Sequence, residues 1–130
     1  MFTLDQIKAA HSQVKSGADF PKYIQDIGKL GVLEYVHFVA DGHTTYYGTD
    51  GFELSGPSKW EPHEIALTGN SEKLKTDLKI HQQGTTSYPI FCEQAAAAGV
   101  EKWVVDIKQM NCVYYDRTGN ALLTENIPNL

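Results

Sequence analysis

The sequence of 130 residues is poor in cysteine, with only Cys92 and Cys112. Two cysteines are too few for a disulfide framework, and their spacing fits neither a zinc knuckle nor a C-x-x-C redox motif. We therefore expect two reduced thiols. Cys92 falls near a predicted helix start, where a thiol pKa can be lowered, but Ile24 occupies the matching place in the repeat described below. That match favours a small buried side chain over a nucleophile.

Basic residues are also scarce. The chain has 11 Lys and Arg against 16 Asp and Glu, a net charge of -5, and no segment gathers the basic residues. Such a chain lacks the cations that neutralise phosphates, so we expect no nucleic-acid partner. The longest apolar run, near "AAAAGV", is far shorter than the about 20 residues of a membrane span, and no signal peptide is recognisable at the N-terminus. The sequence therefore predicts a soluble, cytoplasmic protein with no membrane partner.

Strong catalytic and metal motifs are missing as well. His63 and Glu64 begin like the zinc-protease signature H-E-x-x-H, but Leu67 stands where the second histidine is needed. No G-x-S-x-G, phosphate-loop or G-x-G-x-x-G string occurs. We expect no metal and no cofactor. If a metal were found, His43, Glu61, His63 and Glu64 would be the residues to examine.

The sequence opens with two helix signals. Thr3 and Gln6 form a capping box, and apolar residues at helical spacing predict a helix that ends at Gly17. A second helix is predicted over residues 19–30, with Pro21 in its first turn and Gly31 as its stop.

The segment that follows has strand character. Residues 32–40, "VLEYVHFVA", are rich in β-branched and aromatic residues and run into "DGHTTYYGTDGFELSG". Asp41-Gly42 and Asp50-Gly51 predict two type I′ turns, so these carboxylates have a structural reason to be present. We expect a β-meander.

The second half of the chain repeats this order. Helices are predicted over residues 71–83 and 87–98, and strands over 100–107 and 111–116. When residues 20–51 are laid over residues 88–119, identical residues fall at Pro21/Pro89, Gly31/Gly99, Val32/Val100, Val36/Val104, Tyr46/Tyr114, Tyr47/Tyr115 and Gly51/Gly119. We interpret the match as a tandem duplication of a helix-helix-β-hairpin unit.

The repeat predicts the fold class. One such unit leaves a face of its sheet uncovered, so we expect the two units to form one antiparallel sheet with helices on one face, an α+β fold. The expected organisation is a single domain over residues 1–130, with repeat units of about 3–51 and 71–119, a connector over 52–70 and an extended C-terminal tail over 120–130.

Candidate site residues follow from the repeat. Tyr35 and His37 alternate onto the face that matches Trp103, Val105 and Ile107, so His37 is expected to point toward the core. Each adjacent tyrosine pair sends one ring inward and one outward, and His43 is expected to be mostly exposed. Aromatic rings at a symmetric seam suit an organic ligand. The candidate ligand-binding residues are Tyr35, His37, His43, Tyr46, Tyr47, Trp103, Tyr114 and Tyr115.

The chain also resembles a known family. "FVADGHTTYYGTDGF", "HQQGTTSYPIFCEQAAAAGVEKWVVD" and "CVYYDRTGNALL" are similar to the YbcV-like family of uncharacterised bacterial proteins. Some members lie in prophage regions and carry the label phage envelope protein. The resemblance implies a stand-alone bacterial protein of unknown function and supplies no catalytic residues.

Two classes of function remain open. The first is a non-enzymatic binding module that holds a small molecule or a protein partner at the seam between the repeats. The second is a small enzyme that uses His43 or His37 as a general base with a neighbouring Tyr or Asp, which requires hydrogen-bond reach of the substrate proton.

Overall fold

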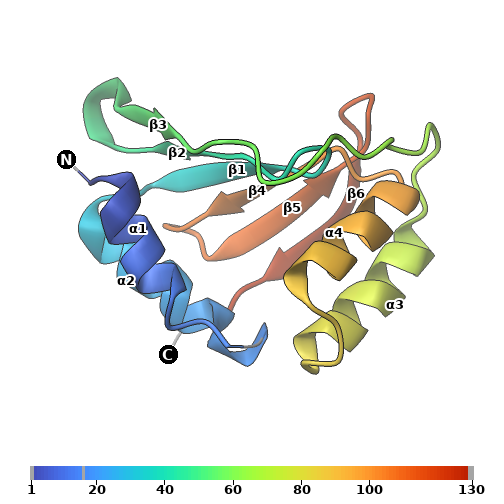
Figure 1. Cartoon of the computed structure of the whole chain (residues 1–130), viewed down its shortest axis with the longest axis horizontal. Coiled ribbons are helices and arrows are strands. Elements are labelled where there is room, and N and C mark those ends of the chain that lie inside the picture. The colour runs from blue at the N-terminus through green and yellow to red at the C-terminus, as the bar shows by residue number, and fades with distance from the viewer. Residues whose placement is uncertain (1, 16, 129–130) are drawn as a thin grey trace.

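The structure of this chain is a computed structural model that describes residues 2–15 and 17–128. Within them lie four α-helices, named α1 (Leu4–His11), α2 (Phe20–Leu30), α3 (Ser71–Gln82) and α4 (Tyr88–Ala97). The strands are β1 (Glu34–Phe38), β2 (Thr44–Tyr47), β3 (Glu53–Ser55), β4 (Lys102–Asp106), β5 (Asn111–Tyr115) and β6 (Ala121–Asn126). They form one antiparallel sheet in the order β3-β2-β1-β4-β5-β6. Both helix pairs lie on the same side of this sheet (Figure 1). The predicted α+β class is confirmed.

The helix ends follow local chemistry. Thr3 caps α1 with the predicted capping box, and Gly31 ends α2 in a left-handed conformation with φ of 109°. The first helix stops at His11 rather than continuing to Gly17 as predicted. Ser12 is the C-cap residue, and its hydroxyl donates to the Ala9 carbonyl at 2.6 Å, which satisfies one of the last helical acceptors.

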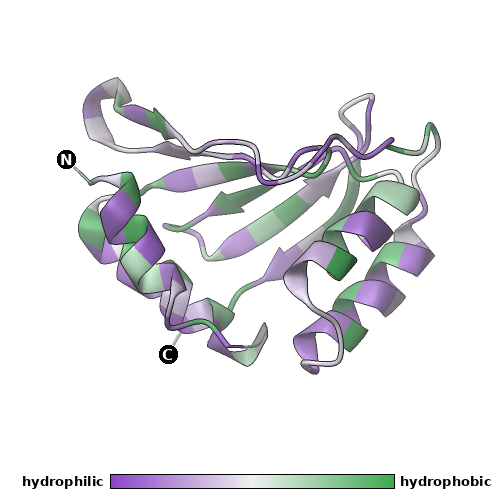
Figure 2. Cartoon of the chain, in the orientation of Figure 1, coloured by the Kyte–Doolittle hydropathy of each residue, from purple (hydrophilic) through white to green (hydrophobic). Residues whose placement is uncertain are grey.

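The sheet buries one face against the helices. In β1, β4 and β5 alternate residues are buried, and these include Tyr35, His37, Trp103, Val105 and Tyr114. The expected inward direction of His37 is confirmed, since only 2% of this residue is exposed. Figure 2 shows hydrophobic residues along β4 and β5 in the middle of the sheet, and alternating hydrophobic and hydrophilic residues along the helices. Amphipathic helices on a half-buried sheet explain both patterns.

The two halves of the chain have matching element boundaries. Strand β4 begins and ends 68 residues after β1, and α4 begins 68 residues after α2. The neighbouring strands β1 and β4 form the centre of the sheet, so the halves meet there. The tandem duplication itself stays a prediction, which superposition of residues 20–51 on residues 88–119 would test.

The edges of the sheet come from the last segment of the expected β-meander, which was also counted in the connector, and from the tail, which was expected to be extended. Residues 53–55 of the expected connector form β3 beside β2, and residues 121–126 of the expected tail form β6 beside β5. Without these strands β2 and β5 would present unpaired backbone groups at the edges of the sheet. After β6, Ile127 is buried and its N donates to Met110 O at 2.7 Å, and residues 129–130 of the predicted tail lie outside the described residues.

The two Asp-Gly turns differ. Asp50 and Gly51 both have positive φ, 57° and 77°, and Phe52 N donates to Thr49 O at 3.1 Å, as the predicted type I′ turn requires. At the first turn the type I′ prediction is wrong. Only Gly42 has positive φ there, because the positive-φ residues other than glycine in residues 2–15 and 17–128 are Asp50 and Met110.

Candidate functional site

A cleft of about 270 Å³ lies between the two helix pairs and the sheet. The α1–α2 segment contributes Phe20 and Tyr23, and the α3–α4 segment contributes Tyr88 and Phe91. The sheet forms the floor, and Lys59 of the connector lies on the wall. The cleft therefore occupies the seam at which the sequence placed a binding site.

Two aromatic pairs cover the floor. Tyr35 of β1 and Tyr46 of β2 have ring centroids 5.6 Å apart at an interplanar angle of 49°. Trp103 of β4 and Tyr114 of β5 are 5.5 Å apart at 53°. Both pairs lie directly across neighbouring strands, and the second pair is 68 residues after the first. The two halves of the chain thus each place an aromatic pair on the floor of the cleft, Tyr–Tyr in one and Trp–Tyr in the other.

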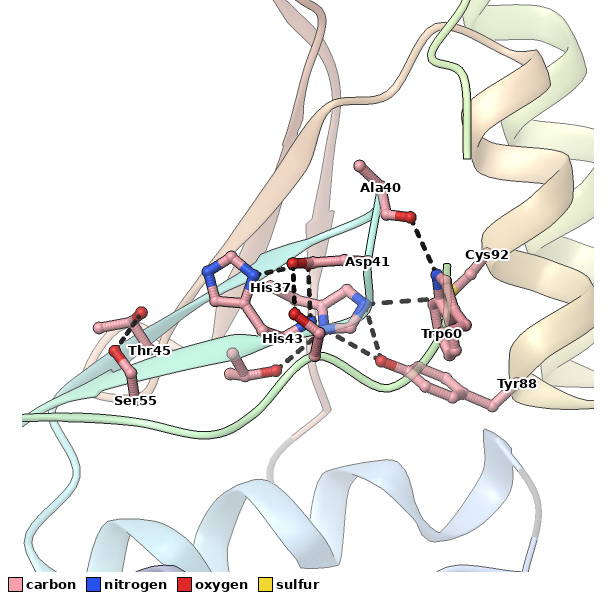
Figure 3. A network of polar contacts seen from close by, with 11 residues as sticks. His37, Ala40, Asp41, His43, Thr45, Ser55, Trp60, Tyr88 and Cys92 are labelled. Carbon is pink, nitrogen blue, oxygen red and sulfur yellow. Dashed lines mark hydrogen bonds and ion pairs between the residues drawn. The ribbon is translucent and has the colours of Figure 1, made fainter. Parts of the chain in front are cut away.

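His37 is the most connected polar side chain in the cleft (Figure 3). Its Nδ1 lies 3.0 Å from Thr44 Oγ1 and 3.0 Å from Tyr88 Oη, and its Nε2 lies 2.7 Å from the same Tyr88 hydroxyl and 3.7 Å from Cys92 Sγ. The ring also packs on Trp103, with centroids 4.3 Å apart. Hydrogen bonds to both nitrogens fix the orientation of the imidazole.

The electrostatics of this cluster favour neutral groups. Burial, aided by the positive charge of Lys59, lowers the pKa of His37 to about 3. Burial also raises the pKa of Tyr88 above its ordinary value and that of Cys92 to about 12. Because Tyr88 keeps its proton, its hydroxyl can donate to Nε2, which leaves Nδ1–H to donate to Thr44. At neutral pH the cluster holds an imidazole, a phenol and a thiol.

The polar groups gather in one half of the cleft. His37, Thr44 and Tyr88 have Val105, Cys112 and Phe20 as their counterparts at the 68-residue offset. At these three positions the other half therefore has no hydroxyl and no imidazole. Glu125 also lines the cleft and accepts a hydrogen bond from Gln82 Nε2 at 2.8 Å. The two halves have matching element boundaries, but the cluster around the His37 imidazole lies in one of them.

The connector lies across the turn between β1 and β2. Lys59 N and Trp60 N donate to the Asp41 carbonyl at 2.8 and 3.3 Å, and Trp60 Nε1 donates to the Ala40 carbonyl at 3.1 Å. The Trp60 ring covers Gly42, where a Cβ would lie 2.7 Å from ring atoms. These contacts hold the backbone on either side of Lys59 at the edge of the cleft.

His43 lies on the opposite face of the sheet from the cleft. Its ring stacks on Phe38 with centroids 4.4 Å apart and an interplanar angle of 8°, and its Nδ1 lies 2.6 Å from Asp41 Oδ1. The side chain is 31% exposed, so the expectation of a mostly exposed residue is corrected. Since Thr44 and Tyr46 point into the cleft, strand alternation directs their neighbour His43 outward.

Asp41 has more contacts than a turn residue needs. It accepts hydrogen bonds from the His43 amide at 3.1 Å and from Ser58 Oγ at 2.8 Å, in addition to the imidazole contact. Burial alone would raise its pKa, but the hydrogen bonds from His43 and Ser58 outweigh burial and lower the pKa to about 2. Asp41 therefore joins the hairpin to the connector.

The eight candidate residues divide between the two faces of the sheet. Tyr47 and Tyr115 project away from the cleft, as the alternation of adjacent residues requires, and Lys102 Nζ lies 5.9 Å from the Tyr115 ring centroid. The structure brings together five of the eight around the cleft, namely Tyr35, His37, Tyr46, Trp103 and Tyr114. His43, Tyr47 and Tyr115 are not among the residues that line it.

The sequence interpretation missed several residues of the cleft. Tyr23 and Tyr88 line it, and each matches an aromatic residue in the other half, Phe91 and Phe20, which also line it. Aromatic residues that match across the repeat were therefore an available signal. Lys59 and Glu125 had no such signal, since both lie in segments expected to be a connector and a tail.

The structure also shows where the two cysteines lie and how the possible metal-binding side chains are arranged. Cys92 and Cys112 are free and buried, as expected for two reduced thiols. In the described ranges, no group of three or more His, Cys, Asp or Glu side chains is arranged to hold a metal ion. The absence of a bound metal in the purified protein stays a prediction for elemental analysis.

Fold and site together define an α+β protein with an aromatic cleft between two helix pairs and a sheet. The chain belongs to the family described as Protein of unknown function (DUF1398), whose model matches residues 8–126. It is 22% identical over 117 residues to the uncharacterized protein YcgX of Escherichia coli strain K12, covering 90% of this chain and 87% of that protein. The expected kinship with an uncharacterised bacterial family is confirmed at this level. None of the helices in residues 2–15 and 17–128 is long and apolar enough to cross a membrane.

Proposed function

We propose that this protein binds a small organic molecule in the aromatic cleft and performs no chemistry on it. The observation that carries the proposal is the floor of paired aromatic rings, with Tyr88 and His37 as polar contacts at one end. Ligand sites combine apolar walls with a few placed polar groups, and this cleft has both. Its volume of about 270 Å³ suits a molecule of one or two rings.

The low pKa and the existing hydrogen bonds of His37 support binding rather than catalysis. A general base works best with a pKa near the operating pH, whereas the pKa of His37 is lowered to about 3 by burial. Both of its ring nitrogens already have hydrogen-bond partners. His43, the other candidate base, lies outside the cleft.

The proposal is tested by ligand-observed NMR with a mixture of one- and two-ring aromatic fragments. Val14→Trp fills part of the cleft, because Val14 lines it, and Leu33→Trp is the matched control at a residue that is 45% exposed. We expect fragments to bind the wild type and L33W and to lose binding in V14W, with thermal unfolding showing that both variants fold. Equal binding to all three proteins would place the fragments elsewhere and reject the proposal.

Further expectations remain proposals that rest on the sequence. They are closer kinship with the YbcV-like group, a prophage association, a cytoplasmic location and the lack of a nucleic-acid partner. The acidic balance of the chain supports the last of these. Duplication of one helix-helix-β-hairpin unit, supported by the matching element boundaries, would explain how a cleft arose between two similar halves.

A further inference from the structure

Lys59 stands out among the charged residues around the cleft because of where its ammonium lies. Its Nζ is 5.2 Å from the centroid of the Tyr88 ring, at the polar end of the cleft. The hydrogen bonds from Lys59 N, Trp60 N and Trp60 Nε1 to the β1–β2 turn fix the connector there. The lysine side chain therefore extends from an anchored backbone toward the imidazole cluster.

This ammonium has no carboxylate counterpart among residues 2–15 and 17–128. The ion pairs found there join Lys22 to Asp26, Lys73 to Asp77, Lys75 to Glu72 and His43 to Asp41. Lys59 as a residue is exposed, but burial of part of its side chain lowers the pKa of its ammonium. Burial first, and the charge of Lys59 second, lower the pKa values of His11 and His37. A cation partly removed from water at an apolar cleft is stabilised by an anion placed beside it.

The opposite end of the cleft disfavours an anion. Glu125 lies there, and its hydrogen-bond partner is the Gln82 amide rather than a cation. A negatively charged group would be repelled by this carboxylate and attracted to Lys59. Lys15 also lines the cleft, but Lys59 is the lysine whose ammonium lies over the Tyr88 ring, so the charges of Lys59 and Glu125 orient an anionic ligand along the aromatic floor.

From this arrangement we infer that the bound molecule is a planar aromatic acid, with its anionic group at Lys59 and its rings over Tyr88 and Trp103. The inference rests on the proposed binding function and adds the chemical class and orientation of the ligand. The ring system lies along the aromatic floor, and the anionic group forms a charge-assisted hydrogen bond with Nζ.

The test compares two probes of nearly equal shape, 1-naphthoate and its neutral analogue 1-naphthalenemethanol, by calorimetric or NMR titration. We expect the wild type to bind the anion about tenfold more tightly than the alcohol, and the preference to weaken with added salt. Lys59→Gln removes the preference and leaves the affinity for the alcohol unchanged, whereas Lys59→Arg retains the preference. Lys108→Gln is the control, because Lys108 is exposed in the β4–β5 turn and does not line the cleft.

The outcomes separate the two proposals. If both probes bind the wild type equally well, or if K59Q weakens both equally, the inference about the acid fails and the binding function stands. An equal loss of preference in K108Q would also overturn the inference, because it would reflect overall charge. If neither probe binds the wild type at millimolar concentration, the inference about the acid fails, and the fragment titration described above decides whether the binding function stands.

Discussion

Tyr88 Oη and His37 Nε2 lie 2.7 Å apart, although 51 residues separate them in the chain. The contact joins the start of α4 to the central strand β1, and both groups lie at the wall of the cleft. The hydroxyl satisfies a nitrogen of an imidazole that is almost fully buried. Because this contact is buried, the stability of the fold is expected to depend on the protonation of His37 and on the presence of the Tyr88 hydroxyl.

Stability should fall as the pH drops below the ordinary pKa of histidine. The pKa of His37 is about 3 in the folded protein and 6.5 ordinarily, so the unfolded chain binds more protons between these values. Each pH unit within this window is expected to cost up to about 1.4 kcal/mol of unfolding free energy. Urea unfolding of the wild type and His37→Asn at pH 7.5, 5.5 and 4.5 checks this. A wild-type slope no steeper than that of H37N would contradict it.

Removing the Tyr88 hydroxyl should leave the imidazole Nε2 with only the weak contact to Cys92 Sγ at 3.7 Å. We expect Tyr88→Phe to reduce the unfolding free energy by about 1 to 3 kcal/mol, the cost of a buried polar group without a partner. Tyr115→Phe is the control, since that ring lies on the opposite face of the sheet, and should change stability by less than about 0.5 kcal/mol. Chemical denaturation of both variants measures the difference. Similar values for Y88F and Y115F would show that the hydroxyl contact is not needed for stability.

The two turn glycines should respond unequally to a side chain. Gly51→Val introduces backbone strain only, because no atom beyond the adjoining residues lies within 4 Å of the position that a Cβ would take. The strain comes from the positive φ of this residue and should cost about 1 to 3 kcal/mol of unfolding free energy. Gly42→Val adds a collision with the Trp60 ring to similar strain and should cost more. The comparison is made by urea unfolding at neutral pH. If G51V proved the more damaging variant, the packing of Trp60 on Gly42 would carry no energetic weight.

Loss of the Asp41 carboxylate should loosen the connector. We expect Asp41→Ala to cost about 1 to 3 kcal/mol and His43→Ala about 1 kcal/mol, because each removes hydrogen bonds at half-buried groups. Asp50→Asn, at an exposed turn residue that tolerates positive φ, is the control. Because the pKa of Asp41 is lowered to about 2, its contribution is present above the ordinary pKa of 3.8 and is lost as the pH falls toward 2. An H43A variant as stable as the wild type would restore the view of His43 as a free surface residue.

Both cysteines should react slowly with thiol reagents while the protein is folded. Burial raises the pKa of Cys92 and of Cys112 to about 12, so the reactive thiolate is scarce at neutral pH. We expect two thiols to react per chain in denaturant and almost none in native buffer, as measured by absorbance after addition of an aromatic disulfide. Rapid reaction of one thiol in native buffer would identify an accessible cysteine and require a different account of the imidazole cluster.

The sequence by itself determined the four helices, the four inner strands and the direction of most of the side chains on those strands. Capping at Thr3, the helix stop at Gly31 and the Asp50-Gly51 turn depend on a few neighbouring residues, so they could be predicted locally. Alternation along β1 and β4 likewise predicted that His37 points inward. The repeat predicted the α+β class and the seam at which the cleft lies.

Tertiary structure decided which groups meet at that seam. Lys59 reaches Tyr88 because the connector is fixed on the β1–β2 turn, and Tyr88 reaches His37 because α4 packs over β1 and β4. The strands β3 and β6 likewise form only where β2 and β5 offer an edge with open hydrogen-bonding groups. Such contacts depend on how distant segments pack rather than on local conformational preference. The aromatic residues of the cleft could therefore be predicted from the sequence. The positions of the charged side chains Lys59 and Glu125, which orient an anionic ligand, could not.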